Sequence, residues 1–256
     1  QKADAYAHER RQMRAPGLRD ASQADDPIIR HPAVQRLLDT QRAWVDAGRV
    51  LAYQTAIELD VAKHHPNPAR RQQADKWCAL VTPVLKASWT DQAFHGSSDC
   101  LQVFGGHGYV REWGVEQIVR DSRVAMIYEG TNEIQAQDLL FRKVLSDQGR
   151  GLDALLNGLQ ADLQGDNAAS VQRTQEGFAR LRDLLAAIES SGAAASEKLY
   201  PVAGDFLRVM TIALMAWAWS RLDAAGAPGN GGQAFVRWVW PELTMRRDMV
   251  LEALKA

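Results

Sequence analysis

Apolar residues recur at three- and four-residue steps in the segment from residue 31 to residue 62. The steps run through Val34, Leu37, Leu38, Gln41, Val45, Gly48, Ala52, Thr55 and Leu59. This spacing places side chains on one face of an α-helix. Pro66 and Pro68 follow and are expected to end the helix, because proline lacks the amide hydrogen that continuation needs. The pattern predicts one long helix whose stripe faces a core.

Further helices are expected beyond these prolines. One runs from about Arg70 to Phe104, with Pro83 as a position where it bends or begins, and shorter helices cover residues 115–124 and 131–147. Short connections favour antiparallel neighbours. No segment combines alternation of apolar and polar residues with turn signals, as a strand would. We therefore predict an all-α fold built on an up-down helical bundle.

Residues 149–256 are expected to form a helical C-terminal extension after a bundle that covers residues 1–148. Gly149 and Gly151 mark the break between them, and the sequence GAPGNGG at 226–232 marks another. An apolar stripe at helical spacing lies between the breaks: Leu199, Val202, Phe206, Val209, Ala213 and Trp217. Four of the eight tryptophans lie in this extension. A tryptophan-rich stripe indicates a core or a subunit interface.

Composition narrows the class of protein without identifying it. The 256 residues are 46% hydrophobic and 24% charged, as in an ordinary globular chain. The net charge of −1 gives no reason to expect a nucleic acid or an anionic membrane as a partner. The longest apolar run, Val209 to Trp219, falls short of the roughly 20 residues that span a bilayer. We expect a cytoplasmic protein without a membrane span, and a truncated or processed chain, because its first residue is Gln.

The cysteines do not indicate a metal or disulfide framework. Cys78 and Cys100 are the only two. His95 could join them as a third zinc ligand, but the spacing matches no ligand pattern. No metal site is predicted.

A glycine-rich turn, QVFGGHG at residues 102–108, directly follows the second long helix. One glycine is enough for a helix C-cap with a left-handed backbone. Three within four positions, Gly105, Gly106 and Gly108, indicate a backbone that a ligand approaches closely, and exposed amides in such a turn can bind a pyrophosphate. The spacing is not the G-x-G-x-x-G of a strand–turn–helix dinucleotide site, and no strand precedes it.

A carboxylate, Glu129, lies in the sequence IYEGTNEIQ at 127–135, where a turn opens the next helix. Taken alone, it is typical of a solvated acid at a helix N-terminus. The apolar run from Val124 to Tyr128 favours burial and the neutral carboxyl group, whereas the dipole of the helix that starts near Thr131 acts the other way. We expect burial to dominate in a substrate-filled pocket. Gly130 carries no side chain and leaves room for a ligand.

In this order and about twenty residues apart, the two motifs resemble the flavin- and substrate-binding signature of the acyl-CoA dehydrogenases. The segment REWGVEQIVRDSRVA at 111–125 is similar to the stretch between the two motifs in that family. Residues 31–62 resemble the first long helix of the family's C-terminal bundle. The resemblance covers residues 1–148 and implies a helical domain and a β-domain ahead of this part. The extension resembles that of the branch that includes enzymes acting on methylmercaptopropionyl-CoA.

The resemblance implies a reaction, the α,β-dehydrogenation of an acyl-CoA thioester. Glu129 would remove the α-proton, and FAD would accept the β-hydride. Such a base must be desolvated and close to the reacting carbon. Tyr128 and Gly130 would contact the substrate.

The resemblance also implies cofactor contacts for Gln102, Gly105, Gly106, Gly108, Thr131, Glu133 and Arg10. Gln102 and the glycine turn would contact the FAD of a neighbouring subunit. Arg10 would meet a phosphate, although this chain has the sequence Arg10-Arg11-Gln12-Met13 where the family often has Arg-x-x-Phe-Gly.

The implied partners are an acyl-CoA substrate, an electron-transfer flavoprotein and further copies of the chain in a homodimer or homotetramer. Two alternatives stay open. One is an acyl-CoA oxidase, which returns the electrons to oxygen. The other is a non-catalytic helical assembly module derived from the family. The presence of Glu129 together with Gln102 and the glycines favours an enzyme.

Overall fold

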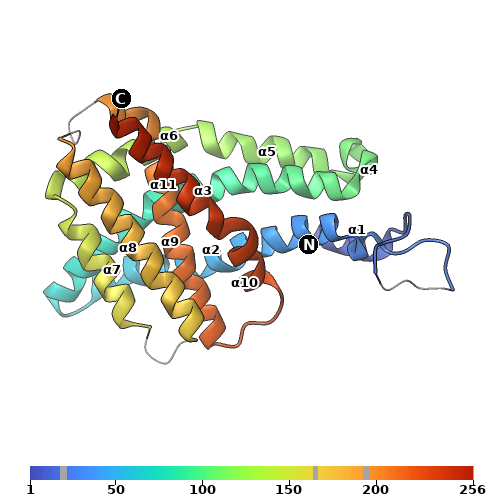
Figure 1. Cartoon of the computed structure of the whole chain (residues 1–256), viewed down its shortest axis with the longest axis horizontal. Helices are drawn as coiled ribbons and strands as arrows, with labels where there is room; N and C mark the ends of the chain where they lie inside the picture. The colour runs from blue at the N-terminus through green and yellow to red at the C-terminus, as the bar shows by residue number, and fades with distance from the viewer. Residues whose placement is uncertain (18–21, 164–166, 193–196, 256) are drawn as a thin grey trace.

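The protein is helical throughout the part of the chain that its computed structural model describes, residues 1–17, 22–163, 167–192 and 197–255 (Figure 1). These ranges contain no β-strand, and an isolated β-bridge joins Arg11 to Pro27. The predicted all-α class, with a helical bundle and a helical extension, is confirmed.

The helices before residue 148 follow the order expected from the sequence. They are α1 (Lys2–Glu9), α2 (Pro32–His64), α3 (Pro68–Phe104), α4 (Gly106–Tyr109), α5 (Val115–Ile127) and α6 (Asn132–Gln137). Short 3₁₀ turns cover Ile28–Arg30 and Arg111–Trp113. α6 continues into a π-helical segment, Asp138–Val144, and a 3₁₀ turn, Leu145–Asp147.

α3 is longer and more regular than the sequence indicated. Pro68 opens it within the first turn, where a missing amide hydrogen costs nothing, and Asn67 Oδ1 accepts a hydrogen bond from Ala69 N at 2.9 Å. The helix then continues through Pro83 for a total of 37 residues. Pro83 is buried, so packing against neighbouring helices overrides its local preference for a break.

A second group of helices follows residue 148. They are α7 (Arg150–Ala161), α8 (Ala168–Ser190), α9 (Ala203–Ala224), α10 (Gly231–Ala234) and α11 (Trp240–Lys255). A 3₁₀ turn at Glu197–Val202 leads into α9, and a π-helical turn at Phe235–Val239 leads into α11. Gly149 has a left-handed backbone with φ of 69° and separates α7 from the preceding turn.

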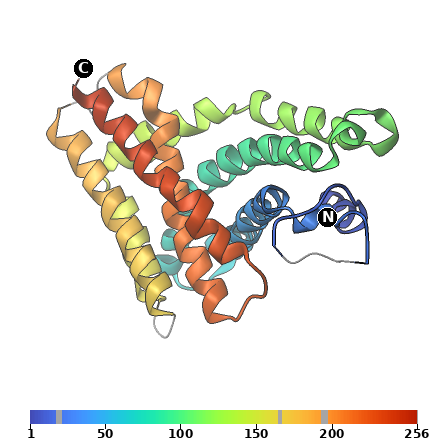
Figure 2. The same cartoon turned by 45° about the vertical axis from the view of Figure 1, so that its right-hand side comes forward.

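The helices form a compact body and an arm (Figures 1 and 2). The body contains α7, α8, α9 and α11 together with parts of α2 and α3. In the arm, α3 and α5 run side by side toward α4, and α1 lies near the start of α2. A separate small apolar cluster holds α1 to the far end of α3 and includes Ala7, Ile28 and Phe104.

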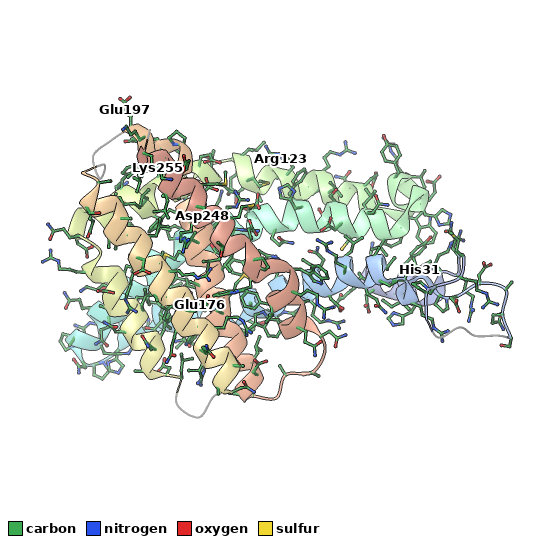
Figure 3. The ribbon with its side chains drawn as sticks, in the orientation of Figure 1. His31, Arg123, Glu176, Glu197, Asp248 and Lys255 are labelled. Atoms are coloured by element: carbon green, nitrogen blue, oxygen red, sulfur yellow. The ribbon has the colours of Figure 1, made fainter. Side chains whose placement is uncertain are left out.

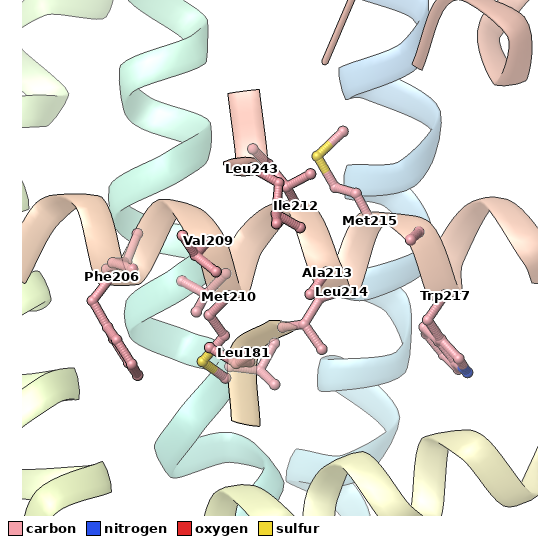
Figure 4. Packing of buried hydrophobic residues seen from close by; sticks show 14 of the residues in the cluster. Leu181, Phe206, Val209, Met210, Ile212, Ala213, Leu214, Met215, Trp217 and Leu243 are labelled. Carbon is pink, nitrogen blue, oxygen red and sulfur yellow. The ribbon is translucent and has the colours of Figure 1, made fainter. Parts of the chain in front are cut away.

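A single apolar core joins the two groups of helices. It contains Leu51 of α2 and Leu80 of α3 as well as Leu181 of α8 and Leu243 of α11, packed around α9. Figure 4 shows the side chains of α9 spreading from the helix in opposite directions, so this helix lies at the centre of the core. The core therefore continues across residue 148, and the division there into two domains stays a prediction.

The central helix also accounts for the most apolar part of the sequence. Glu197–Ala224 is long and apolar enough to cross a membrane by length and composition, but 78% of its most apolar window is buried among the protein's own helices. The predicted stripe of Phe206, Val209, Ala213 and Trp217 is buried, as expected for a core. The other faces of α9 are buried too.

The predicted stripe of α2 is correct at some positions and wrong by one residue at others. Gly48 and Thr55 are buried, whereas Val45, Ala52 and Leu59 are exposed. The core instead receives Trp44, Leu51 and Glu58. At Glu58 the error has a physical cause. Its carboxylate accepts hydrogen bonds from Arg70 at 2.7 Å and from Gln54 at 2.9 Å, so a charged residue occupies a buried position that an apolar pattern cannot reveal.

Two leucines of α2 test this register. Leu51 is fully buried and Leu59 is 45% exposed. Leu51→Ala should lower the free energy of unfolding by about 2–5 kcal/mol, because it leaves a cavity in the core. Leu59→Ala, the matched control, should change it by less than about 0.5 kcal/mol. Urea denaturation followed by circular dichroism measures both, and equal losses would contradict the observed register.

Candidate functional site

The two sequence motifs lie at opposite ends of α5. The glycine turn connects the end of α3 to α4 at the tip of the arm, and the turn formed by residues 128–131 lies between α5 and α6 beside the body (Figure 1). α5 has 13 residues, which corresponds to roughly 20 Å along its axis. Within one chain, Glu129 and the glycine turn are therefore separated.

The three glycines of the arm differ in whether the fold of the chain requires a residue without a side chain. Gly105 has φ of 58° and ψ of −140°, a backbone conformation that favours glycine. A Cβ at Gly108 would lie 2.8 Å from both Leu101 O and Phe104 Cβ, so packing of α4 against α3 excludes a side chain. A Cβ at Gly106 would meet nothing within 4 Å. The fold of this chain would therefore leave room for a side chain at position 106.

An aromatic cluster that sequence reasoning missed supports the glycine turn. The Tyr6 ring stacks on Phe104 with centroids 4.3 Å apart, and His107 stacks on Trp113 at 5.1 Å. The Tyr6 hydroxyl and His107 Nδ1 are hydrogen-bonded at 2.8 Å, which joins the two stacks. The aromatic residues within and after the QVFGGHG motif were the signal in the sequence that could have predicted this cluster. Their contact with Tyr6 of α1 joins residues far apart in the sequence, so no local pattern indicates it.

Three predicted cofactor residues share one hollow in the arm. Its volume is about 240 Å³, and its lining includes Arg10, Gln102 and Gly105. His31, missed by the sequence reasoning, also lines it and lies in the arm beyond the compact body (Figure 3). The His31 ring is held by a 3.0 Å hydrogen bond between Nε2 and Gln12 O. The hollow thus combines an arginine, an amide side chain and a glycine backbone, a donor set suited to an anionic group.

The 128–131 turn has a defined backbone and an exposed carboxylate. Gly130 has a left-handed φ of 71°. Thr131 caps α6, because its Oγ1 accepts a hydrogen bond from Ile134 N at 3.4 Å. Glu129 is exposed, as are Val124 and Tyr128. This chain alone therefore does not desolvate Glu129. Its burial in a complete, substrate-filled pocket stays a prediction.

Glu133 points toward the C-terminal helices. Its Oε2 lies 3.8 Å from the position that a Cβ of Gly204 would occupy at the start of α9. Glu133 and Asn132 line a hollow of about 240 Å³ that Asp91, Arg208 and Arg246 also line. Thr131 and Glu133 are close to Glu129 in the sequence, but Glu133 lines a hollow beside the C-terminal helices, whereas Glu129 lies on the exposed turn. Both residues lie at the opposite end of α5 from Gln102 and the glycine turn.

The alternative zinc site is excluded by geometry. Cys78 and Cys100 both lie on the unbroken helix α3, roughly 33 Å apart along its axis. Among the residues that the structure describes, no group of three His, Cys, Asp or Glu side chains could hold a metal ion.

A family model of the C-terminal domain of acyl-CoA dehydrogenases matches residues 6–143. This stretch is more than half of the chain and contains both motifs. The chain belongs to the acyl-CoA dehydrogenase family. The predicted resemblance is confirmed.

Curated relatives extend the similarity of this chain beyond residue 143. It is 39% identical over 190 residues to a 3-methylmercaptopropionyl-CoA dehydrogenase of Ruegeria pomeroyi, a match that covers 73% of this chain and 32% of that protein. It is 31% identical over 188 residues to the broad-specificity linear acyl-CoA dehydrogenase FadE5 of Mycobacterium tuberculosis, covering 73% and 30%. The chain thus spans about a third of the length of these curated relatives.

Solved structures share the fold. An acyl-CoA dehydrogenase from Bacillus anthracis complexed with FAD has a TM-score of 0.71 at 19% identity, covering 100% of this chain and 45% of that one. ACDH-11 of Caenorhabditis elegans, in complex with C11-CoA, has a TM-score of 0.65 at 20% identity, covering 99% and 44%. Both matches include the C-terminal helices as well as the bundle.

An ion network lies beside the hollow that Glu133 lines. Arg208 makes two 3.0 Å hydrogen bonds to Glu242, and Arg246 contacts Glu242 at 2.9 Å and Asp205 at 2.8 Å. Burial alone would raise the pKa of the Glu242 carboxyl, but the charges and hydrogen bonds of Arg208 and Arg246 outweigh it and hold that pKa below its ordinary value. The network fixes α11 to α9 near α6.

The lowered pKa of Glu242 predicts a pH-dependent stability. Because the folded pKa lies below the unfolded one, the ionised carboxylate stabilises the fold above the unfolded pKa, and this contribution is lost as pH falls through the folded pKa. Glu242→Gln should therefore cost roughly 1–3 kcal/mol at neutral pH and less in acid. Urea unfolding between pH 7 and 3 measures the difference, with the exposed Glu252→Gln as control. A constant difference across this range would contradict the assignment.

Proposed function

We propose that the full-length protein catalyses α,β-dehydrogenation of an acyl-CoA thioester with FAD as cofactor and Glu129 as the base. The observation that carries the proposal is the exposed carboxylate of Glu129 on a turn with a defined backbone, inside a domain of the acyl-CoA dehydrogenase family. Curated relatives that act on acyl-CoA thioesters support the substrate class.

Glu129 has the access that the reaction requires. Its carboxylate takes the α-proton, and the electron pair of that C–H bond forms the α,β double bond as the β-hydrogen leaves as a hydride. Bound FAD supplies the acceptor for that hydride. Tyr128 and Gly130 flank the base and form the substrate wall that this chain contributes. Desolvation of Glu129, which the chain alone does not provide, follows from closure of the complete site around it.

The arm fits a dinucleotide. Gly106 leaves open space where a side chain would stand, and Gln102, Gly105 and Arg10 line the adjacent hollow. Backbone amides of such a turn, together with an arginine, can hold a pyrophosphate. Thr131 and Glu133, which the chain places at the other end of α5, contribute to the cofactor site near the base.

The separation of the two motifs supports a shared site in a homodimer or homotetramer. One copy supplies Glu129, and the glycine turn of another copy contacts the same FAD. Exposed apolar side chains continue along the arm and support such assembly: Tyr109, Val110, Trp113, Ile118, Val124 and Ile127. An electron-transfer flavoprotein is the proposed electron acceptor, and the cytoplasm the proposed location. Rapid flavin reoxidation by oxygen would identify an oxidase instead.

Replacing Glu129 by Gln tests the base. Gln is nearly isosteric but cannot accept the α-proton, so Glu129→Gln in the full-length protein should keep FAD bound and slow substrate-dependent flavin bleaching by about 10²–10⁴-fold. Stopped-flow absorbance measures the bleaching. Glu116→Gln, in the first turn of α5 at its far end from Glu129, is the control. Bleaching of the Glu129→Gln protein at nearly the wild-type rate would remove Glu129 from the mechanism.

Replacing Gly106 by Val tests the cofactor turn. The side chain has room within the chain, so the fold should persist, while FAD retention and assembly weaken together because a ligand shared between copies stabilises only the assembled form. Gel filtration with absorbance detection reports both quantities. Gly158→Val, at another glycine with open space around its Cβ, is the matched control. If Gly106→Val changes neither the flavin content nor the size of the assembly, the turn serves only as a helix cap.

A further inference from the structure

The side chain of Glu129 has no fixed partner in the described contacts of its own turn. Its position therefore depends on the two flanks, Tyr128 at the end of α5 and Asn132 at the start of α6. Gly130 between them adds backbone freedom, since it lacks a Cβ. Holding the base in place requires that both flanks be tied to a rigid element.

Asn132 ties the α6 flank to α3. Its Oδ1 accepts hydrogen bonds from Lys86 Nζ and Thr90 Oγ1, each at 2.9 Å. Its Nδ2 donates to Ala87 O at 3.0 Å. Three of the four hydrogen bonds that an asparagine amide can form are thus directed to one turn of α3.

Lys86 contacts the other flank as well. Its Nζ lies 5.8 Å from the centroid of the Tyr128 ring, within the range of a cation–π interaction. Lys86 is half-buried, and its two described partners, the amide of Asn132 and the ring of Tyr128, are uncharged. None of the described contacts of Lys86 is an ion pair, so pairing with a carboxylate does not explain why an ammonium group lies here.

We propose that Lys86 is a positioning residue that holds both flanks of the 128–131 turn and thereby fixes Glu129 relative to the substrate. The proposal rests on the function of Glu129 proposed above. Lys86 does not touch the reacting atoms; it acts through Tyr128 and Asn132. The middle of α3 is a suitable anchor because α3 is packed against the core on the adjacent positions Val84, Ala87 and Ser88.

The expected effect follows from the sensitivity of proton transfer to geometry. A displacement of about 1 Å at the reacting groups can cost on the order of 10²-fold in rate. In the full-length protein, Lys86→Met keeps the apolar stem and removes the ammonium group. It should lower kcat by about 10–100-fold and change KM and FAD content by a smaller factor. Lys86→Arg, which can donate to Asn132 and stack on Tyr128, should recover most of kcat.

Two further variants keep the test specific. Lys76→Met removes an exposed lysine from the same helix, away from the turn, and should leave kcat unchanged. Asn132→Leu removes the same contact from the other side and should reproduce the loss seen with Lys86→Met. If Lys86→Met lowers thermal stability so far that it cannot be assayed, Asn132→Leu carries the measurement.

Hydrogen exchange separates this proposal from the proposed function. Amides of residues 128–132 should exchange faster in Lys86→Met than in wild type or Lys76→Met, while the amides of α9 keep their protection. This measurement needs no turnover, so it decides the proposal even if the wild-type protein dehydrogenates no acyl-CoA. Unchanged exchange at 128–132, or a kcat within twofold of wild type, would overturn the positioning role.

Discussion

The burial of α9 on all sides from Val209 to Ser220 is the constraint on which the rest of the structure depends. A helix that is apolar on all sides must be surrounded by other helices, and α2, α3, α8 and α11 supply this cover. Two of its polar side chains are paired across these contacts: Thr211 Oγ1 meets Ser88 Oγ of α3 at 2.6 Å, and Trp219 Nε1 donates to Ala43 O of α2 at 3.2 Å. The buried Trp217 Nε1 has no hydrogen-bond partner among the described residues. The C-terminal helices are thus part of the core that orients α2 and α3.

This arrangement gives α3 two different environments along its length. The part near Ser88 is fixed by α9, and from there the helix extends into the arm with α5 beside it. The body supports the turn that carries Glu129, and the arm carries the glycine turn. The glycines of the arm divide in the same way: Gly108 serves internal packing, whereas Gly106 leaves a surface open to another molecule.

Local patterns in the sequence predicted the elements and the positions of the motifs. Proline and glycine signals marked the ends of α2, α3 and α9, and the dense apolar run at Val209–Trp219 indicated the core. The two motifs were correctly expected at helix ends. These features depend on neighbouring residues, so a single sequence carries them.

Features that depend on distant pairs were not predictable in this way. Glu58 occupies a core position of α2 only because Arg70 of α3 neutralises it. Tyr6 joins the glycine turn across 101 positions, and Lys86 meets Asn132 across 46. The apolar run before Glu129 does not tell whether the residues that cover it lie within the same chain. Polar and aromatic contacts of this kind have no periodic signature.

Because α3 continues unbroken through Pro83, it fixes the distance between the residues along it. Lys86 and Gln102 both lie on this helix, roughly 24 Å apart along its axis. One residue inserted between them would move the glycine turn by roughly 1.5 Å and rotate it by roughly 100°. α5 packs beside α3 over this stretch. Within one chain, the separation of the Glu129 turn and the glycine turn is therefore set by the number of helical residues in α3 and α5.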